Sequence, residues 1–206
     1  SDFTKVDGLG GIGITAIKAS PNSKELLIGY EDGLLELWSE NNIIQIPDIF
    51  ASGRYPGKSR INSISFDGEN KAFVATGFGV VELDLIYGVV KGAYILSQDG
   101  TAIETFDIEI DSDSLFVSSE KGFWSASIAD PLYLFSNWKQ DPRWIDTIIN
   151  EISVSENSRL ISTKQNESVW YRNNGAWSKI NLNNSSGNKI KSIRKQENGY
   201  VISRDF

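Results

Sequence analysis

Apolar residues recur along the chain at intervals of 41 to 47 residues, in two series offset by about ten positions. The first series is Ile17, Ile64, Ile108, Ile152 and Ile193. The second series is Ile28, Val74, Val117, Ile161 and Ile202. Each pair marks two short strands joined by a polar turn, and five pairs in register indicate an internal repeat. A repeat of this length built from short strands predicts a β-propeller, whose blades bury their faces against one another.

The repeat predicts an all-β fold in which each complete unit forms one four-stranded antiparallel blade. We expect one partial propeller domain over residues 1–206, with about four blades and part of a fifth. The expected blades are 14–60, 61–104, 105–146, 147–189 and the incomplete 190–206. The second strand of each unit is almost continuously apolar, which is typical of a strand covered on both faces. Glycines at 33, 79 and 122 are expected to allow the tight turns that follow these second strands.

Strict alternation within INSISF (61–66) places Ile61 with Ser63 on one face and Ile64 on the other. The segment 132–138 (LYLFSNW) is expected to be the fourth strand of the third blade. No helix longer than a turn is predicted. The longest connection is expected at 47–60, and the polar segment 183–188 is expected to be a loop.

The number of units is smaller than a closed ring requires. A seven-bladed ring needs about 300 residues, so we expect the front part of a longer propeller. An open blade edge would expose unpaired backbone groups, which predicts self-association through that edge. Because the chain has no methionine, we expect a processed product or an excised fragment. No signal peptide is found in the sequence, and we expect that one was removed. No apolar run reaches the ~20 residues of a membrane span.

The composition excludes several kinds of chemistry. With 20 basic and 27 acidic residues the net charge is −7, which disfavours nucleic acid as a partner, because binding phosphates requires excess Lys and Arg. Histidine and cysteine are both absent. The commonest general base and the commonest transition-metal ligands are therefore missing. No cofactor is predicted.

Three segments resemble a known family. GLGGIGITAIKASPNSKELLIGYEDGLLELW (8–38), INSISFDGENKAFVATGFGVVELDL (61–85) and FVSSEKGFWSASI (116–128) are similar to PorZ-like proteins of the type IX secretion system. These belong to the two-component-regulator-type propeller repeats of Bacteroidota. The resemblance runs from roughly residue 3 to 140.

This resemblance implies a large, multi-domain cell-surface protein, and we expect this chain to be a non-catalytic part of it. In that family two propellers precede a β-sandwich, and the protein joins the complex that attaches exported cargo to surface lipopolysaccharide. Partners would be secretion-complex proteins or an anionic surface glycan, at the cell surface or in the periplasm. The alternative is the periplasmic ligand-sensing propeller of a hybrid two-component sensor. Such sensors carry a W-I-G-T signature, where this chain has LLIGY, FVATG and FVSSE.

A loop between the third and fourth units combines aromatic and charged residues. Its candidate ligand contacts are Trp138, Lys139, Asp141, Arg143 and Trp144. Aromatic rings can stack on a sugar while the polar groups orient its hydroxyls. The alternative is that both tryptophans fill space between blades.

A basic stretch lies near the C-terminus. Residues 179–206 contain six basic and two acidic residues. Its candidate anion contacts are Lys189, Lys191, Arg194 and Lys195. Such a stretch would attract an anionic glycan or lipid headgroup. The alternative is an ordinary solvated strand.

The carboxylates do not form a convincing catalytic or metal site. Asp107, Asp111 and Asp113 suit turn capping better than calcium, which needs more oxygen ligands. Paired carboxylates also occur at Glu31, Asp32, Glu36, Glu82 and Asp84, on hairpins or outer strands. A carboxylate-dependent polysaccharide-active enzyme is thus the least favoured alternative, and no catalytic or metal-binding residue is assigned.

Overall fold

The protein is described by a computed structural model over residues 10–40, 42–52, 58–155, 158–164, 168–173, 175–181, 190–196 and 199–204. Over these residues the structure contains four four-stranded antiparallel sheets and a fifth sheet of two strands. This confirms the predicted all-β propeller fold with four four-stranded blades and part of a fifth. The chain divides into two compact units, 1–108 and 109–206, and the division falls within strand β9. Each unit is described by itself.

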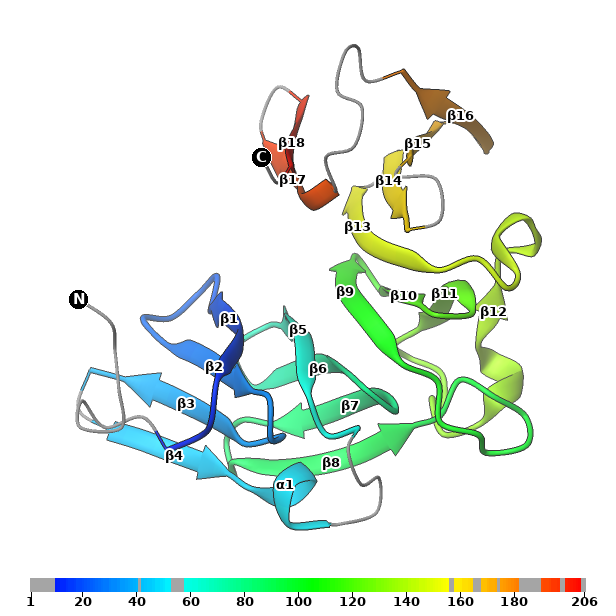
Figure 1. The fold of residues 1–206 in the computed structure, drawn as a ribbon. Coiled ribbons are helices and arrows are strands. Elements are labelled where there is room, and N and C mark those ends of the chain that lie inside the picture. Colours follow the sequence, from blue (N-terminus) through cyan, green and yellow to red (C-terminus); the bar gives the residue numbers. More distant parts are fainter. Residues whose placement is uncertain are drawn as a thin grey trace. The chain divides into compact units, whose positions relative to one another are not determined.

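The first unit contains two sheets, each a simple meander of consecutive strands (Figure 1). The first consists of β1 (Ile14–Ala19), β2 (Leu26–Tyr30), β3 (Leu35–Ser39) and β4 (Asn42–Ile46). A short helix, α1 (Asp48–Ser52), follows. The second consists of β5 (Ile61–Asp67), β6 (Lys71–Thr76), β7 (Gly79–Asp84) and β8 (Val89–Tyr94).

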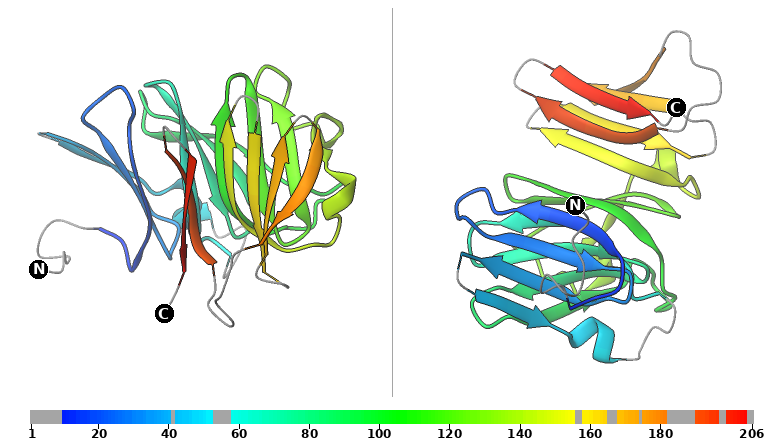
Figure 2. Two further views of the ribbon diagram at one scale, coloured as in Figure 1. Left: turned by 90° about the horizontal axis from the view of Figure 1, so that it is seen from above. Right: turned by 60° about the vertical axis from the view of Figure 1, so that its left-hand side comes forward.

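The second unit continues the same pattern. The third sheet consists of β9 (Thr105–Asp111), β10 (Ser114–Ser119), β11 (Gly122–Ser127) and β12 (Lys139–Gln140), with 3-10 helices η2 (Phe135–Asn137) and η3 (Pro142–Trp144) beside β12. The fourth consists of β13 (Ile149–Ser155), β14 (Ser158–Thr163), β15 (Ser168–Asn173) and β16 (Ala176–Ile180). The last pair is β17 (Ile190–Gln196) and β18 (Gly199–Arg204), shown from two further directions in Figure 2.

The two apolar series of the sequence are direct cross-strand partners. The pairs are Ile17 with Ile28, Ile64 with Val74, Ile152 with Ile161, and Ile193 with Ile202. Because side chains on a strand alternate between faces, a constant register keeps one apolar row on the same face of each blade. The spacing of the sequence therefore reflects real pairing in these four hairpins.

The alternation predicted from Ile61 is wrong at its first residue. The register of β5 against β6 shifts between Ile61 and Ser63, a β-bulge that leaves Asn62 without a Cα partner. Consequently Ile61 packs in the same apolar cluster as Ile64 instead of opposite to it. The same shift occurs between Ile14 and Ala16, and the first strands β13 and β17 repeat it. A bulge at a fixed place in a repeat is a structural feature that bends the strand.

The prediction of a strand at 132–138 is also wrong. That segment contains η2, and the fourth strand of the third sheet is only the two residues of β12, which pair with Trp124 and Ser125. The indole Nε1 of Trp138 donates a hydrogen bond to the carbonyl of Leu132 at 2.8 Å. This closes 132–138 into a compact loop and takes Trp138 out of an extended conformation.

A fully buried carboxylate organises one face of the first sheet. Glu36 accepts hydrogen bonds from the Tyr30 hydroxyl at 2.6 Å, from Trp38 Nε1 at 3.2 Å and from Gln45 Nε2 at 3.0 Å. The backbone N–H of Gly10 donates to the same group at 3.0 Å. Four donors offset the cost of burying the charge. They also tie the segment before β1 to the sheet.

Two tyrosines are expected to make the fold sensitive to alkali. Burial, then a hydrogen bond to Glu36 and the charges of Glu36 and Asp32, raise the pKa of Tyr30 above its ordinary value. Burial and Glu82 raise the pKa of Tyr94 in the same way. The unfolded chain loses these protons near about pH 10, before the folded chain does. Their contribution is therefore complete below about pH 10 and is lost as the pH rises further.

The measurement is the urea midpoint at pH 8, 10 and 11 (roughly bracketing the tyrosine pKa). The double variant Tyr30→Phe/Tyr94→Phe should lose less stability between pH 8 and 11 than the wild type. Tyr87→Phe, which alters a largely exposed ring, serves as the control and should follow the wild type. Parallel curves for all three proteins would contradict the prediction.

Candidate functional site

The loop 139–144 is held in place by one carboxylate. Asp141 precedes η3, and its Oδ1 accepts a hydrogen bond from the backbone N–H of Arg143 at 3.0 Å. Its Oδ2 accepts one from Trp177 Nε1 at 3.1 Å, and Arg172 Nη1 lies 3.6 Å from the same oxygen. Asp141 therefore joins the loop to β15 and β16, and its negative charge is compensated by these contacts within the protein.

Aromatic rings and guanidinium groups alternate beside this loop. Trp144 makes edge contacts with Trp170 and Trp177, with ring centroids 5.3 and 5.4 Å apart. The guanidinium of Arg143 lies 4.7 Å from the centre of the Trp170 ring, and that of Arg172 lies 5.8 Å from the centre of Trp177. Arginine is attracted to an aromatic face because the ring carries negative charge there.

Two arginines are direct neighbours across strands in the fourth sheet. Arg159 of β14 pairs with Arg172 of β15, and Arg172 pairs with Trp177 of β16. The guanidinium of Arg159 stands 4.4 Å from the centre of the Phe116 ring. Burial, then the positive charge of Arg172, lower the pKa of Arg159, while Asp141 and Asp111 oppose the change.

The predicted ligand contacts are only partly accessible. Trp138 and Trp144 are each 5% exposed, so their rings have little face to offer a sugar. This is the space-filling arrangement considered as the alternative. Lys139 and Arg143 are exposed. Sugar binding at this loop stays a prediction, and it would depend on these two cations more than on tryptophan stacking.

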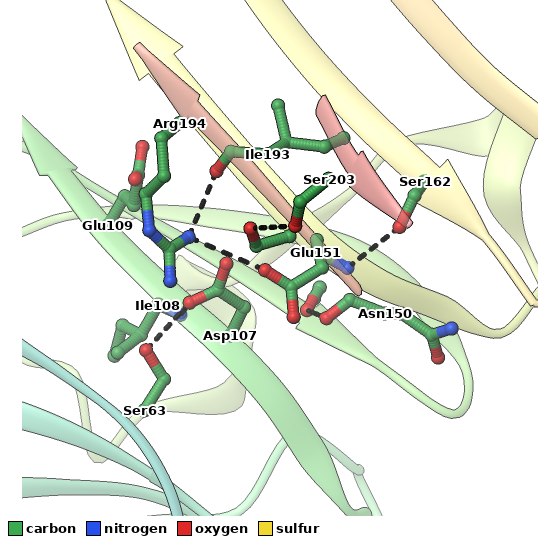
Figure 3. Close-up of polar contacts among 12 residues, drawn as sticks. Ser63, Asp107, Ile108, Glu109, Asn150, Glu151, Ser162, Ile193, Arg194 and Ser203 are labelled. Carbon is green, nitrogen blue, oxygen red and sulfur yellow. Dashed lines mark hydrogen bonds and ion pairs between the residues drawn. The ribbon is translucent and has the colours of Figure 1, made fainter. Parts of the chain in front are cut away.

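The structure describes only part of the predicted anion contacts. Lys189, and the side chain of Lys195, lie outside the described residues, and Lys191 is exposed. Arg194, whose side chain is 62% exposed, faces Glu151 with 3.5 Å between Nη1 and Oε2 (Figure 3). Its charge is partly compensated by this neighbour. Anion binding here also stays a prediction.

Polar side chains on first strands connect successive sheets within each unit. In the first unit, the Ser63 hydroxyl donates to Asp107 Oδ1 at 2.6 Å (Figure 3), and Asn62 donates to the carbonyl of Thr105 at 2.7 Å. In the second, Glu109 accepts a hydrogen bond from the backbone N–H of Val154 at 2.5 Å. These contacts give the polar side chains of the first strands partners in the neighbouring sheet.

The Glu151–Arg194 pair is expected to contribute little stability. Exposed ion pairs are typically worth about 0.2–1 kcal/mol, and the arginine is mostly solvated. A double-mutant cycle with Glu151→Gln and Arg194→Gln should give a coupling in that range, which decreases with added salt. The free energy of unfolding measures it, and a coupling well above about 1 kcal/mol would show a more shielded pair.

The remaining candidate carboxylates are placed for structural roles. Asp84 Oδ1 accepts hydrogen bonds from the N–H groups of Ile86 and Tyr87, and Glu82 contacts the Tyr94 hydroxyl and Lys91. Asp107 accepts from the N–H of Ile108. Across the described ranges, no group of three or more acidic side chains is arranged to hold a metal ion.

Sequence reasoning missed the arginine pair and the polar links between sheets. A signal for the arginines existed. In the second sheet the corresponding cross-strand row is Phe66, Ala72, Leu83 and Val90, and its two central members are fully buried. In the fourth sheet the same row is Val154, Arg159, Arg172 and Trp177. Aligning the repeats would have shown two charges in an apolar row.

Comparison with known proteins identifies the family. The family model of the PorZ N-terminal beta-propeller domain, of the type IX secretion system, matches residues 1–139. The chain belongs to this family. A search of curated proteins finds no match.

Solved structures confirm the fold. PorZ of Porphyromonas gingivalis, described as an essential bacterial surface component of the type-IX secretion system, superimposes with a TM-score of 0.76 at 18% identity, over 98% of this chain and 26% of that one. The extracellular domain described for a hybrid two component system of B. thetaiotaomicron gives 0.70 at 13%, over 96% and 26%. The Myceliophteria thermophila Cps50 (Swd1) propeller gives 0.68 at 14%, over 95% and 63%.

The chain thus spans about a quarter of PorZ and of the two-component protein. Among the described residues, none of the helices has the length and apolar character needed to cross a membrane.

Proposed function

We propose that this PorZ-family propeller is a non-catalytic binding and scaffold domain of a surface protein associated with type IX secretion. The family match over residues 1–139 carries the proposal. In this proposal its ligand is an anionic surface glycan or a protein of the secretion complex, and it acts at the cell surface or in the periplasm. Its mechanism is presentation, in which rigid sheets hold loops in a fixed conformation and so reduce the entropy lost on binding.

The best supported contact loop is 139–144. Asp141 fixes its backbone, Trp144 anchors it among aromatic rings, and the exposed Lys139 and Arg143 project two positive charges from an acidic protein. Local positive charge on an acidic surface favours an anionic ligand over a neutral one.

The test is titration with an anionic and a neutral polysaccharide. The double variant Lys139→Ala/Arg143→Ala should bind the anionic polymer about tenfold more weakly, a loss of about 1.4 kcal/mol. Lys18→Ala/Lys24→Ala removes the same charge from exposed positions in β1 and in the turn after it, and should bind as the wild type does. Equal loss in both variants would contradict a role for the loop. Release of reducing ends would contradict the non-catalytic part of the proposal.

A ligand-sensing propeller of a hybrid two-component system is the second candidate, supported by the B. thetaiotaomicron similarity. Immunoblotting of membrane fractions separates the two. A sensor must be one polypeptide with a kinase domain and a membrane helix, whereas a surface secretion component must have neither.

Self-association of the chain is a further prediction from its sequence. Light scattering tests it, and a monodisperse monomer would contradict it.

A further inference from the structure

The cross-strand pair Arg159 and Arg172 lowers the stability of the folded state. Like charges directly opposite each other on neighbouring strands repel, and the two corresponding residues of the second sheet, Ala72 and Leu83, are apolar and fully buried. Partial burial adds a desolvation cost to each guanidinium. When a cross-strand row in one sheet differs in polarity from the same row in the other sheets, we expect that row to have a function.

The two arginines differ in how their donors are used. Arg172, with 31% of its side chain exposed, lies 3.6 Å from Asp141 and donates from Nε to the carbonyl of Gly175 at 3.3 Å. Arg159 contacts the Phe116 ring, and its guanidinium forms no hydrogen bond or ion pair with another described residue. Asp141 and then Asp111 attract Arg159, and neither forms an ion pair with it within the described part of the chain. Up to five N–H donors of Arg159 are thus available to a ligand.

We infer that Arg159 and Arg172 form an oxyanion-binding site, which takes a doubly charged group such as a phosphate ester between the third and fourth sheets. Two guanidiniums can bind such a group through paired hydrogen bonds, and the anion removes their mutual repulsion. Phe116 and Trp177 flank the pair and hold both guanidiniums by their aromatic faces. Arg143, stacked on Trp170, adds a third positive charge beside Asp141.

The test uses the whole chain with inorganic phosphate, inorganic sulfate and chloride at equal ionic strength, followed by tryptophan fluorescence on heating. At a tenfold excess over its Kd, phosphate should raise the Tm by about 3–6 °C relative to chloride. Sulfate acting equally would indicate a general dianion site, and phosphate acting alone would indicate a phosphoryl site. No rise from either anion relative to chloride would overturn the inference.

Variants separate binding from a structural role. Arg159→Ala introduces the alanine that the second sheet has at the corresponding position. The variant should therefore fold with an unchanged or higher Tm in chloride, and it should lose the phosphate response. Arg159→Gln keeps most of the volume and should lose the response too. Arg60→Gln removes an exposed charge near Glu31 and should keep it in full. A retained response in both Arg159 variants would overturn the inference. Because the ligand is an inorganic anion, the outcome is independent of polysaccharide binding.

Discussion

Ile152→Ala should destabilise the protein by about 2–5 kcal/mol, the usual cost of truncating a large buried aliphatic residue. Ile152 is 0% exposed and packs with Ile149, Ile161 and Trp144 between the third and fourth sheets. The surrounding strands are fixed by their hydrogen bonds and cannot collapse into the space. Urea unfolding followed by fluorescence and by circular dichroism measures the loss.

The repeat itself supplies the control. Ile17 occupies the same place in the first unit, paired with Ile28 as Ile152 is with Ile161, but it is 58% exposed. Ile17→Ala should therefore cost about 0.5 kcal/mol or less. Comparable losses at the two positions would contradict the predicted difference, and would show that Ile17 is covered in solution.

Gly122→Ala should destabilise the protein by about 3 kcal/mol or more, because two costs add. Gly122 has a φ of 132°, which L-residues rarely adopt, and such strain costs about 1–3 kcal/mol. An added Cβ would also lie 2.3 Å from the carbonyl oxygen of Trp144. That backbone cannot move without displacing the anchor of the loop 139–144, so overpacking adds a similar amount, about 1–3 kcal/mol.

Gly68→Ala is the matched control. Its φ is 70°, but an added Cβ would meet no atom within 4 Å. Only the backbone cost of about 1–2 kcal/mol should remain. The difference between the two free energies of unfolding gives the cost of the contact with Trp144 together with the difference in backbone strain between φ values of 132° and 70°. Equal values would mean that the loop after β12 yields easily, which would weaken the proposal that it is rigid.

Local features of the sequence were sufficient for the strands and their hairpins. Residues such as Ile64 and Val74 pair as their spacing predicted because an antiparallel hairpin is set by its own turn. Glycines at 33, 79 and 122 adopt positive φ, since a short turn after a buried strand needs that conformation. The hydroxyls of Thr76 and Ser119 donate to the carbonyls of Gly79 and Gly122 across these turns.

The candidate sites were less predictable. The sequence placed Trp138 at the end of a fourth strand that the structure does not form, and the burial of Trp138 and Trp144 depends on Leu132, Trp170 and Trp177. Whether a tryptophan faces a ligand or a neighbouring sheet is decided by packing between successive sheets, which no local sequence pattern encodes. The compensation of Arg194 by Glu151 likewise joins residues 43 positions apart.

The sequence by itself determined a repeating meander of short strands, the place of its turns and an acidic surface without histidine or cysteine, because these depend on residue type and on neighbours within one hairpin. Only the tertiary structure decided where the bulges fall, which aromatic rings are buried and that Arg159 lies against Arg172. Those outcomes depend on the face that each sheet presents to the next, and burial and charge pairing are set there.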